Sequence, residues 1–271
     1  MLGTRSRRVA KALLRAYNDG VVWKANRAKR KILLTSIPKA GTHLLMAVLQ
    51  QYTGGRLISL GEGRAVDEWN RRVPLTIDFL EEKDALVRPG DIMWGHVTPD
   101  AERVRFFEDR GYVIFLNIRD PRDVVCSRLN QAMGQETDQY HEVVASLSDT
   151  QERVDQIIRH YTTWDDVSIG ETFERYRRWE ESARVTTLRY ERLVGPEGGG
   201  LSGAQLSEMR KLESSFGLIG VPMIYRRFMA RRIYNGEGRI GRHRELFTER
   251  NLTLFDEMFS QDLLDWALAE E

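Results

Sequence analysis

Residues 32–43, with the sequence ILLTSIPKAGTH, decide how this chain folds. The apolar run at the start of this stretch predicts a short buried strand, and apolar side chains then recur at helical spacing over residues 42–52. Pro38 and Gly41 stand between the two segments and favour a loop. The stretch therefore predicts a strand, a loop and a helix in direct succession.

The same alternation continues along the chain. Apolar runs predict further strands over residues 91–94, 112–118 and 185–188. Helical spacing predicts helices over residues 99–109, 121–130, 150–181 and 204–216. Residues 195–203 are expected to form a glycine-rich surface loop, and residues 53–88 and 131–150 to form long irregular connections. This order predicts an α/β fold, a central parallel sheet flanked by helices, in a single domain over residues 32–271.

Composition limits the class of protein. A chain of 271 residues can bury a substantial core. Its 41 basic and 40 acidic side chains give a net charge of only +1, so the overall charge does not favour a nucleic acid as partner. Cys126 is the only cysteine, so no internal disulfide can form and a reducing cytoplasm is the expected compartment. No run of 18 apolar residues is present to span a bilayer. We expect a cytoplasmic globular protein.

Residues 1–31 form a basic segment in which Asp19 is the only acidic residue. Apolar side chains at positions 9, 12, 13, 16 and 17 follow a helical repeat, which predicts an amphipathic helix. We favour a helix that docks on the domain. The alternative is a peripheral contact with an anionic membrane surface.

Three common motifs are excluded by their context. Residues 236–241, GEGRIG, match a dinucleotide-binding fingerprint in letters, but no strand is predicted before them and no helix directly after them. The lysine of the 38–42 loop precedes its glycine, which disfavours an ordinary ATP-binding P-loop. The five histidines show no metal-ligand spacing, so we predict no metal.

The loop at residues 36–42 has the composition of an anion site. Backbone N–H groups at the start of a helix point at one spot, and the helix dipole adds partial positive charge there. Lys39 brings a full charge, Gly41 permits close approach of the backbone, and Thr42 offers a hydroxyl. An ordinary strand-to-helix turn with an exposed lysine is the alternative.

A second anion site is indicated where the strand at 112–118 ends. Arg119 follows this strand, Asp120 and Pro121 suit the start of a helix, and Ser127 lies about 10 Å further along that helix. Arginine and serine together can hold a phosphate, although Arg119 could instead pair with Asp120 or Asp123. Since ligands of parallel sheets bind at the carboxyl ends of the strands, one ligand with two anionic groups would fill both sites.

With these motifs the chain resembles the sulfotransferases that use 3′-phosphoadenosine 5′-phosphosulfate (PAPS). Residues 37–43 resemble the 5′-phosphosulfate loop of that family, and residues 119–127 resemble its 3′-phosphate motif. Residues 190–193, YERL, resemble its Y-E-x-L/M step, and residues 238–248 resemble its C-terminal glycine segment. The resemblance implies a P-loop-like, three-layer sulfotransferase fold and PAPS as co-substrate, with no metal.

The resemblance also implies roles for individual residues. His96, which follows a predicted strand, stands where the family has the histidine that removes the acceptor proton, and Lys39 is implied to be catalytic beside it. The ordinary pKa of histidine, about 6.5, suits a general base. The residues implied to bind the donor are Lys39, Ala40, Gly41, Thr42, His43, Leu44, Arg119, Ser127, Tyr190, Gly238 and Arg239.

The chain departs from the family pattern at several positions. Ala40 replaces a serine, and Leu44 stands where animal cytosolic members often have a tryptophan against the adenine. Trp94 takes the place of a lysine, so charge stabilisation is expected to depend more on Lys39. Residues 236–237 replace an arginine–lysine pair, so another arginine is needed there.

The reaction implied is in-line transfer of a sulfuryl group from PAPS to an acceptor hydroxyl or amine, with a small molecule or a lipid as acceptor. Residues 53–88 and 131–150 are expected to shape the acceptor pocket. Two other functions stay open. One is an ATP-dependent phosphotransferase, which requires magnesium. The other is a non-catalytic nucleotide-binding or membrane-docking protein.

Overall fold

The computed structural model describes residues 30–60, 75–138, 140–161, 167–216 and 238–269. The amphipathic helix predicted from positions 9–17 lies outside this part of the chain, and of the basic segment 1–31 only the last two residues lie inside it. The first two residues of the 236–241 motif lie outside it as well. The docking of the basic segment and the cytoplasmic location stay predictions.

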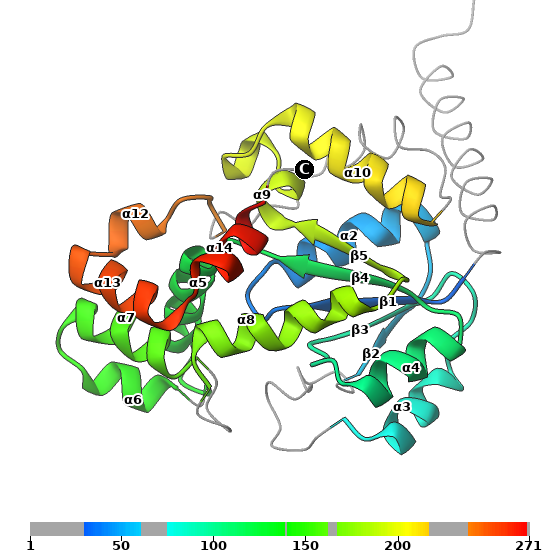
Figure 1. The fold of residues 1–271 in the computed structure, drawn as a ribbon, viewed down its shortest axis with the longest axis horizontal. Helices are drawn as coiled ribbons and strands as arrows, with labels where there is room; N and C mark the ends of the chain where they lie inside the picture. Colours follow the sequence, from blue (N-terminus) through cyan, green and yellow to red (C-terminus); the bar gives the residue numbers. More distant parts are fainter. Residues whose placement is uncertain (1–29, 61–74, 139, 162–166, 217–237, 270–271) are drawn as a thin grey trace, which may run out of the picture.

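A parallel sheet of five strands forms the centre of the described structure (Figure 1). The strands are β1 (Ile32–Ser36), β2 (Leu57–Ser59), β3 (Ile92–Gly95), β4 (Val113–Ile118) and β5 (Val185–Arg189). Their order is β2-β3-β1-β4-β5, and every neighbouring pair is parallel. In this register Leu33 of β1 lies opposite Met93 of β3 and Ile114 of β4. The predicted central parallel sheet is confirmed.

Helices cover both faces of the sheet, which makes three layers. Successive residues of a strand face opposite sides, so Leu34 packs with the buried residues of α2 and α10 whereas Leu33 belongs to the larger core on the other face. The helices of the first face are α2 (Thr42–Thr53), α9 (Tyr190–Leu193) and α10 (Ser202–Phe216). The larger core includes side chains of α3 (Ile77–Asp84), α4 (Ala101–Asp109), α5 (Pro121–Gly134), α6 (His141–Ser146), α7 (Thr150–Arg159), α8 (Ile169–Arg177), α13 (Glu249–Met258) and α14 (Gln261–Leu268). The described part also contains α12 (His243–Leu246) and the 3₁₀ turns η1 (Arg178–Glu181) and η2 (Pro196–Gly198).

The start of α5 shows how local sequence sets an element that later carries the site. Asp120 is the N-cap residue and its side chain accepts the N–H of Arg122, while Pro121 takes the first helical position. The predicted start is confirmed. The helix continues to Gly134, beyond the predicted end at residue 130.

Two connections that we expected to be irregular contain regular elements. Strand β2 and helix α3 lie within residues 53–88, and the end of α5 together with α6 lies within residues 131–150. The expected loop at 195–203 contains η2 and the first residues of α10. These elements are short, and a strand of three residues such as β2 is too short for hydrophobic periodicity to identify. The helices α13 and α14 were also not predicted.

Within the described ranges no helix has the length and apolar character needed to cross a membrane. The same residues contain no group of three or more histidine, cysteine or acidic side chains placed to hold a metal ion.

At Gly170, the second residue of α8, the backbone of this helix packs directly against the end of α13. A Cβ atom at this position would lie 1.8 Å from the carbonyl oxygen of Met258, at the end of α13. Gly203 is the second residue of α10, and a Cβ atom there would meet no heavy atom within 4 Å.

The substitution Gly170→Ala should therefore lower the free energy of unfolding by about 1–3 kcal/mol, because the backbone of Met258 has to move. Gly203→Ala is the matched control and should be neutral or stabilising by up to about 1 kcal/mol, since alanine favours the helix. Urea titrations of both variants measure the difference. Equal midpoints would contradict this packing.

Candidate functional site

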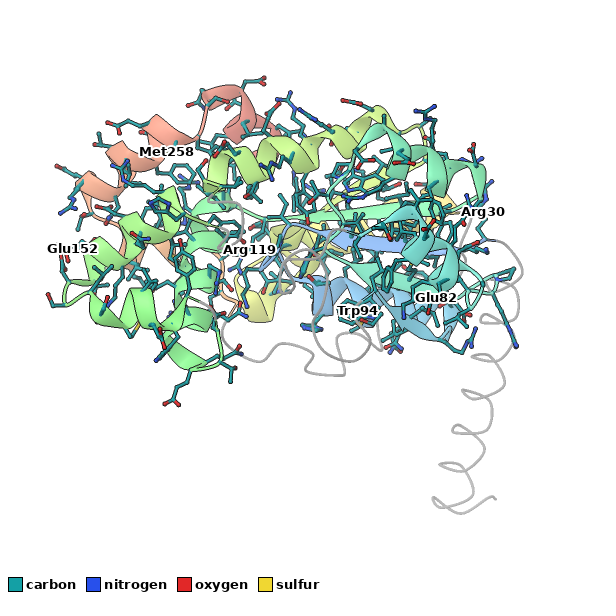
Figure 2. All side chains as sticks on the ribbon, turned by 90° about the horizontal axis from the view of Figure 1, so that it is seen from below. Arg30, Glu82, Trp94, Arg119, Glu152 and Met258 are labelled. Carbon is teal, nitrogen blue, oxygen red and sulfur yellow. The ribbon has the colours of Figure 1, made fainter. Side chains whose placement is uncertain are left out.

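Three loops meet at one edge of the sheet because β1 lies between β3 and β4. The loop after β1 carries Lys39, His96 directly follows β3, and Arg119 directly follows β4. Parallel strands end at the same edge, so the two predicted anion sites and the predicted base lie on the same side of the sheet. In Figure 2 Arg119 lies between Glu152 of α7 and Trp94 of β3.

The Lys39 loop has a strained backbone that its surroundings hold in place. Lys39 has a φ of 66° and is the only non-glycine residue with positive φ in the described ranges. The hydroxyl of the fully buried Tyr161 donates to the carbonyl of Pro38 at 2.6 Å. The side-chain amide of Asn117, in β4, donates to the carbonyl of Ala40 at 2.6 Å. Strain of this kind persists only where neighbours fix it, and it is concentrated at functional sites.

The start of α2 offers backbone N–H groups without a competing carboxylate. Its N-cap residue is Gly41 in the left-handed conformation, with φ 95°, and no acidic residue lies in its first turn. A Cβ atom on Gly41 would lie 2.3 Å from the ring of Tyr190 and 3.3 Å from the side-chain amide of Asn117. Only glycine fits this position, and the loop can bring its backbone close to an anion.

The imidazole of His96 is oriented by the last residue of β1. Nδ1 of His96 lies 2.9 Å from the carbonyl oxygen of Ser36 and 3.2 Å from its Oγ. Because a carbonyl oxygen only accepts, Nδ1 carries the hydrogen in the neutral ring, which places the lone pair on Nε2. The Ser36 hydroxyl also lies 2.6 Å from that of Thr42, so the Thr42 hydroxyl is engaged within the protein. The partly exposed His96 ring can therefore accept a proton through Nε2.

His43, in the first turn of α2, is a second histidine close to this edge. Its ring centroid lies 6.1 Å from that of Trp94. Partial burial lowers the pKa of His43, and the charges of His96 and Lys39 lower it further. The neutral form of His43 is thus favoured at neutral pH. Leu44 and Trp94, two of the departures from the family pattern, are both partly buried against the core on the α2 face.

Arg119 is 3% exposed and held from three directions. Its guanidinium carbon lies 4.4 Å from the centroid of the Tyr190 ring, Nη2 donates to the carbonyl of Arg239 at 3.1 Å, and Nη2 lies 3.8 Å from Oδ2 of Asp123.

Of the two pairings considered for Arg119 from the sequence, the one with Asp123 is present, whereas Asp120 pairs with Arg122 at 2.7 Å. The Nε of Arg119 is buried and has no hydrogen-bond partner among the described residues. Ser127 lies further along α5 and is partly exposed.

A C-terminal segment, residues 238–243, closes over this arginine; we call it the strap. The Tyr190 hydroxyl donates to the carbonyl of Gly238 at 2.6 Å. The carboxylate of Asp123 accepts the backbone N–H groups of Gly241 and His243. The structure thus brings Tyr190, Gly238 and Arg239 together with Arg119. That these residues bind the donor stays a prediction. The side chain of Arg239 is exposed and lies 3.4 Å from Glu245, while its backbone carbonyl makes the contact with Arg119.

Sequence reasoning missed four residues that shape these loops. Tyr161 and Asn117 hold the Lys39 loop, and Asp123 with His243 holds the strap. Asn117 gave a usable signal, because an amide within a buried strand needs a partner. The sequence indicated Asp123 only as a local partner of Arg119 or of the helix start and not as an acceptor for the strap, and nothing local to Tyr161 or His243 indicates a contact more than a hundred residues away.

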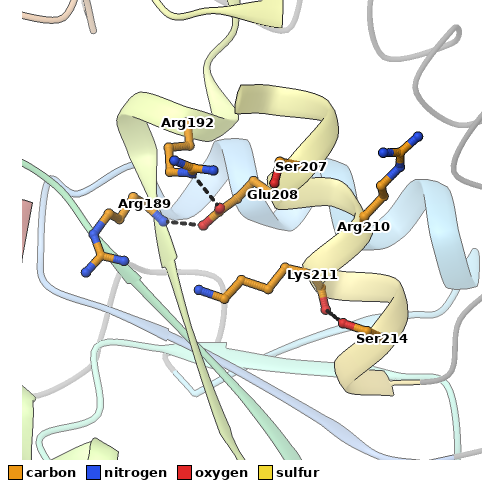
Figure 3. A pocket seen from close by; sticks show the side chains of 7 residues that line it. All are labelled: Arg189, Arg192, Ser207, Glu208, Arg210, Lys211 and Ser214. Carbon is orange, nitrogen blue, oxygen red and sulfur yellow. Dashed lines mark hydrogen bonds and ion pairs between the residues drawn. The ribbon is translucent and has the colours of Figure 1, made fainter. Parts of the chain in front are cut away.

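A basic pocket beside the end of β5 is built around a structural anchor (Figure 3). Glu208 of α10 is 2% exposed and accepts both the backbone N–H of Arg189 and the Nε–H of Arg192. The guanidinium of Arg189 points away from Glu208, and it donates to the carbonyl of Trp266. These contacts fasten α9 and α10 to β5, which positions Tyr190.

Glu191 contacts the backbone of Asp120, the residue that follows Arg119. Its carboxyl group accepts the N–H of Asp120 at 2.9 Å. Burial raises the pKa of Glu191 to about 7, even though this hydrogen bond and the charge of Arg119 act in the opposite direction.

Comparison with known proteins identifies a family and a fold. The model of the sulfotransferase domain matches residues 29–195. The fold is similar to that of the mouse sulfotransferase SULT7A1 complexed with PAP, at 15% identity, with 92% of this chain and 90% of that chain covered and a TM-score of 0.54. It is also similar to retinol dehydratase in complex with androsterone and inactive cofactor PAP, at 14% identity, with 92% and 85% covered and a TM-score of 0.51. At these identities the structural likeness concerns the fold. No curated protein sequence matches the chain significantly.

The pKa of Glu191 predicts a pH dependence of stability. A carboxyl group with a raised pKa in the folded state stabilises the fold below its unfolded pKa, about 4.3, and this contribution is lost as the pH rises through about 7. The loss is at most about 4 kcal/mol. Glu191→Gln, which stays neutral, should flatten the dependence of the unfolding free energy on pH between 5 and 8, whereas Glu181→Gln at an exposed site should not. Urea unfolding across this range is the measurement, and parallel curves for wild type and Glu191→Gln would refute the assignment.

Proposed function

This chain belongs to the sulfotransferase family, and we propose that it transfers a sulfuryl group in line from PAPS to a hydroxyl or amine of a small-molecule or lipid acceptor. The observation that carries the proposal is the placement of Lys39 after β1 and Arg119 after the adjacent strand β4, at the same end of the sheet. His96 follows β3, the neighbour of β1 on the other side. The structures of similar fold that contain PAP support the choice of donor.

The residues present fit a donor with two separated anionic ends. Lys39 and the first N–H groups of α2 would hold the 5′-phosphosulfate, since no acidic side chain in the first turn competes and Gly41 leaves the backbone accessible. Arg119 would hold the 3′-phosphate, and its Nε–H still lacks an acceptor. Ser127, further along α5, would add a hydroxyl donor.

In the proposed mechanism His96 Nε2 removes the proton of the acceptor, because Nδ1–H is committed to the carbonyl of Ser36. PAPS supplies an activated sulfuryl group whose leaving group is a phosphate. Lys39 stabilises the negative charge that grows on this phosphate, together with the N–H groups around Gly41 and Thr42. The strained backbone at Lys39 supports this role, because strain of this kind is concentrated at functional sites.

The donor assignment is tested by calorimetry with PAP and with AMP, which lacks the 3′-phosphate. The wild type should bind PAP at least about 10-fold more tightly than AMP, because a charge-assisted bidentate contact contributes about 1.5–3 kcal/mol. Arg119→Ala should abolish this preference. Arg122→Ala, which removes the neighbouring arginine that pairs with Asp120, should preserve it. Equal binding of both nucleotides by the wild type would contradict the site.

The role of Lys39 predicts a larger effect on turnover than on binding. Lys39→Met removes the charge and should lower kcat about 100-fold or more, because the charge it stabilises is greatest in the transition state. The affinity for PAP should fall by less than about 10-fold. Turnover is measured as PAP released from PAPS with the acceptor that a panel of phenols, alcohols and amines identifies. An unchanged kcat would refute the assignment.

Variants of the two histidines at this end of the sheet show which of them is the general base. His96→Asn should lower kcat by about 100-fold or more and remove the lower limb of the pH–rate profile. His43→Asn, the matched change in the first turn of α2, should keep that limb and most of the turnover. The reverse pattern would assign the base to His43.

A further inference from the structure

Asp123 is a fully buried carboxylate whose hydrogen bonds come from the strap. Oδ1 accepts the N–H of His243 at 3.0 Å and lies 2.9 Å from Nδ1 of the same residue. Oδ2 accepts the N–H of Gly241 at 2.7 Å. A buried charge is costly unless it is fully hydrogen-bonded, so α5 and the strap are coupled through this one side chain.

The same carboxylate also faces the arginine that we assign to the 3′-phosphate. Oδ2 of Asp123 lies 3.8 Å from Nη2 of Arg119. Burial raises the pKa of Asp123, but the hydrogen bonds from His243 and Gly241 and the charge of Arg119 outweigh this effect and hold the pKa below its usual range. The carboxylate is therefore ionised at neutral pH and attracts the guanidinium.

The position of the strap also determines two further contacts, one to Arg119 and one to Tyr190. The carbonyl of Arg239 accepts from Arg119, and the carbonyl of Gly238 accepts from the hydroxyl of Tyr190, the ring of which lies against the guanidinium. If the strap moves, Arg119 loses the acceptor at Arg239, and Tyr190 loses the acceptor at Gly238.

His243 is suited to fix the strap. A carboxylate only accepts, so Nδ1 of His243 carries a hydrogen and donates to Asp123. The ring is 8% exposed and lies edge-on to Phe247, with centroids 6.2 Å apart, which limits its rotation. Nδ1 also lies 3.9 Å from Oδ2 of Asp120, the N-cap residue of α5.

Resting on the proposed function, we propose that His243 is a positioning residue: through Asp123 it holds the strap and the guanidinium of Arg119 in the arrangement that recognises the 3′-phosphate of the donor. His243 touches no reacting atom in this account. Its removal should therefore weaken recognition of the 3′-phosphate selectively.

The test compares His243→Phe, which keeps a ring but removes the donor, with His243→Asn, whose side-chain amide can place an N–H close to where Nδ1 lies. Calorimetry with PAP and AMP should show that His243→Phe binds PAP about 10-fold more weakly and AMP within about 2-fold of the wild type. His243→Asn should restore most of the preference. The double variant Arg119→Ala/His243→Phe should lose no more than Arg119→Ala alone, because both changes remove the same interaction.

Equal weakening of both nucleotides by His243→Phe, or additive losses in the double variant, would overturn the inference, since a merely structural role produces them. A wild type that does not distinguish PAP from AMP would instead contradict the proposed function and the inference with it. A measurement on the wild type stands beside the variants in case His243→Phe does not fold. PAP, and AMP much less, should slow hydrogen exchange of the Gly241 and His243 amides. Equal protection of these amides by both nucleotides would contradict the proposed role of the strap in recognising the 3′-phosphate.

Discussion

The central position of β1 is the constraint on which the site depends. Parallel pairing with β3 on one side and β4 on the other aligns three strand ends. Lys39 lies in the loop after β1, whereas His96 and Arg119 directly follow β3 and β4. The pairing also explains why His96 is oriented by a carbonyl of β1, and why an amide of β4 reaches the loop that follows β1. A shift in register by one residue would turn the apolar side chains of β1 to the wrong face and separate these partners.

Around this strand the protein stabilises a backbone that is unfavourable by itself. A left-handed lysine costs on the order of 1–3 kcal/mol, and the turn at Gly41 admits no side chain. Hydrogen bonds from Tyr161 and Asn117, each contributing about 1 kcal/mol, offset part of that cost. Arg119 is a buried cation, which is unfavourable unless an opposite charge lies near it, and Asp123 supplies that charge. The strap adds a carbonyl that accepts from Arg119. The backbone at Lys39 and the guanidinium of Arg119 are thus held in place by their neighbours. Preorganisation of this kind would reduce the entropy lost when the proposed anion binds.

Local sequence was sufficient for the parts of the fold with strong local signals. The strand and helix on either side of Lys39 follow from an apolar run, a proline and a glycine, and the start of α5 follows from Asp120 and Pro121. The order of the strands has no local signal, and β2 is too short to show a period. The contacts that complete the site join residues far apart, such as Asp123 and His243, 120 residues apart, and depend on the chain having folded. The family resemblance supplied the nucleotide, which spacing alone did not.

The central claim is that Lys39 and Arg119 bind opposite ends of one donor nucleotide. The most direct measurement is a crystal structure of the protein with PAP. We expect the 5′-phosphate within hydrogen-bond distance of Lys39 Nζ and the first amides of α2, and the 3′-phosphate against the Arg119 guanidinium. Electron density for the nucleotide at another place, with neither residue in contact with a phosphate, would contradict the account.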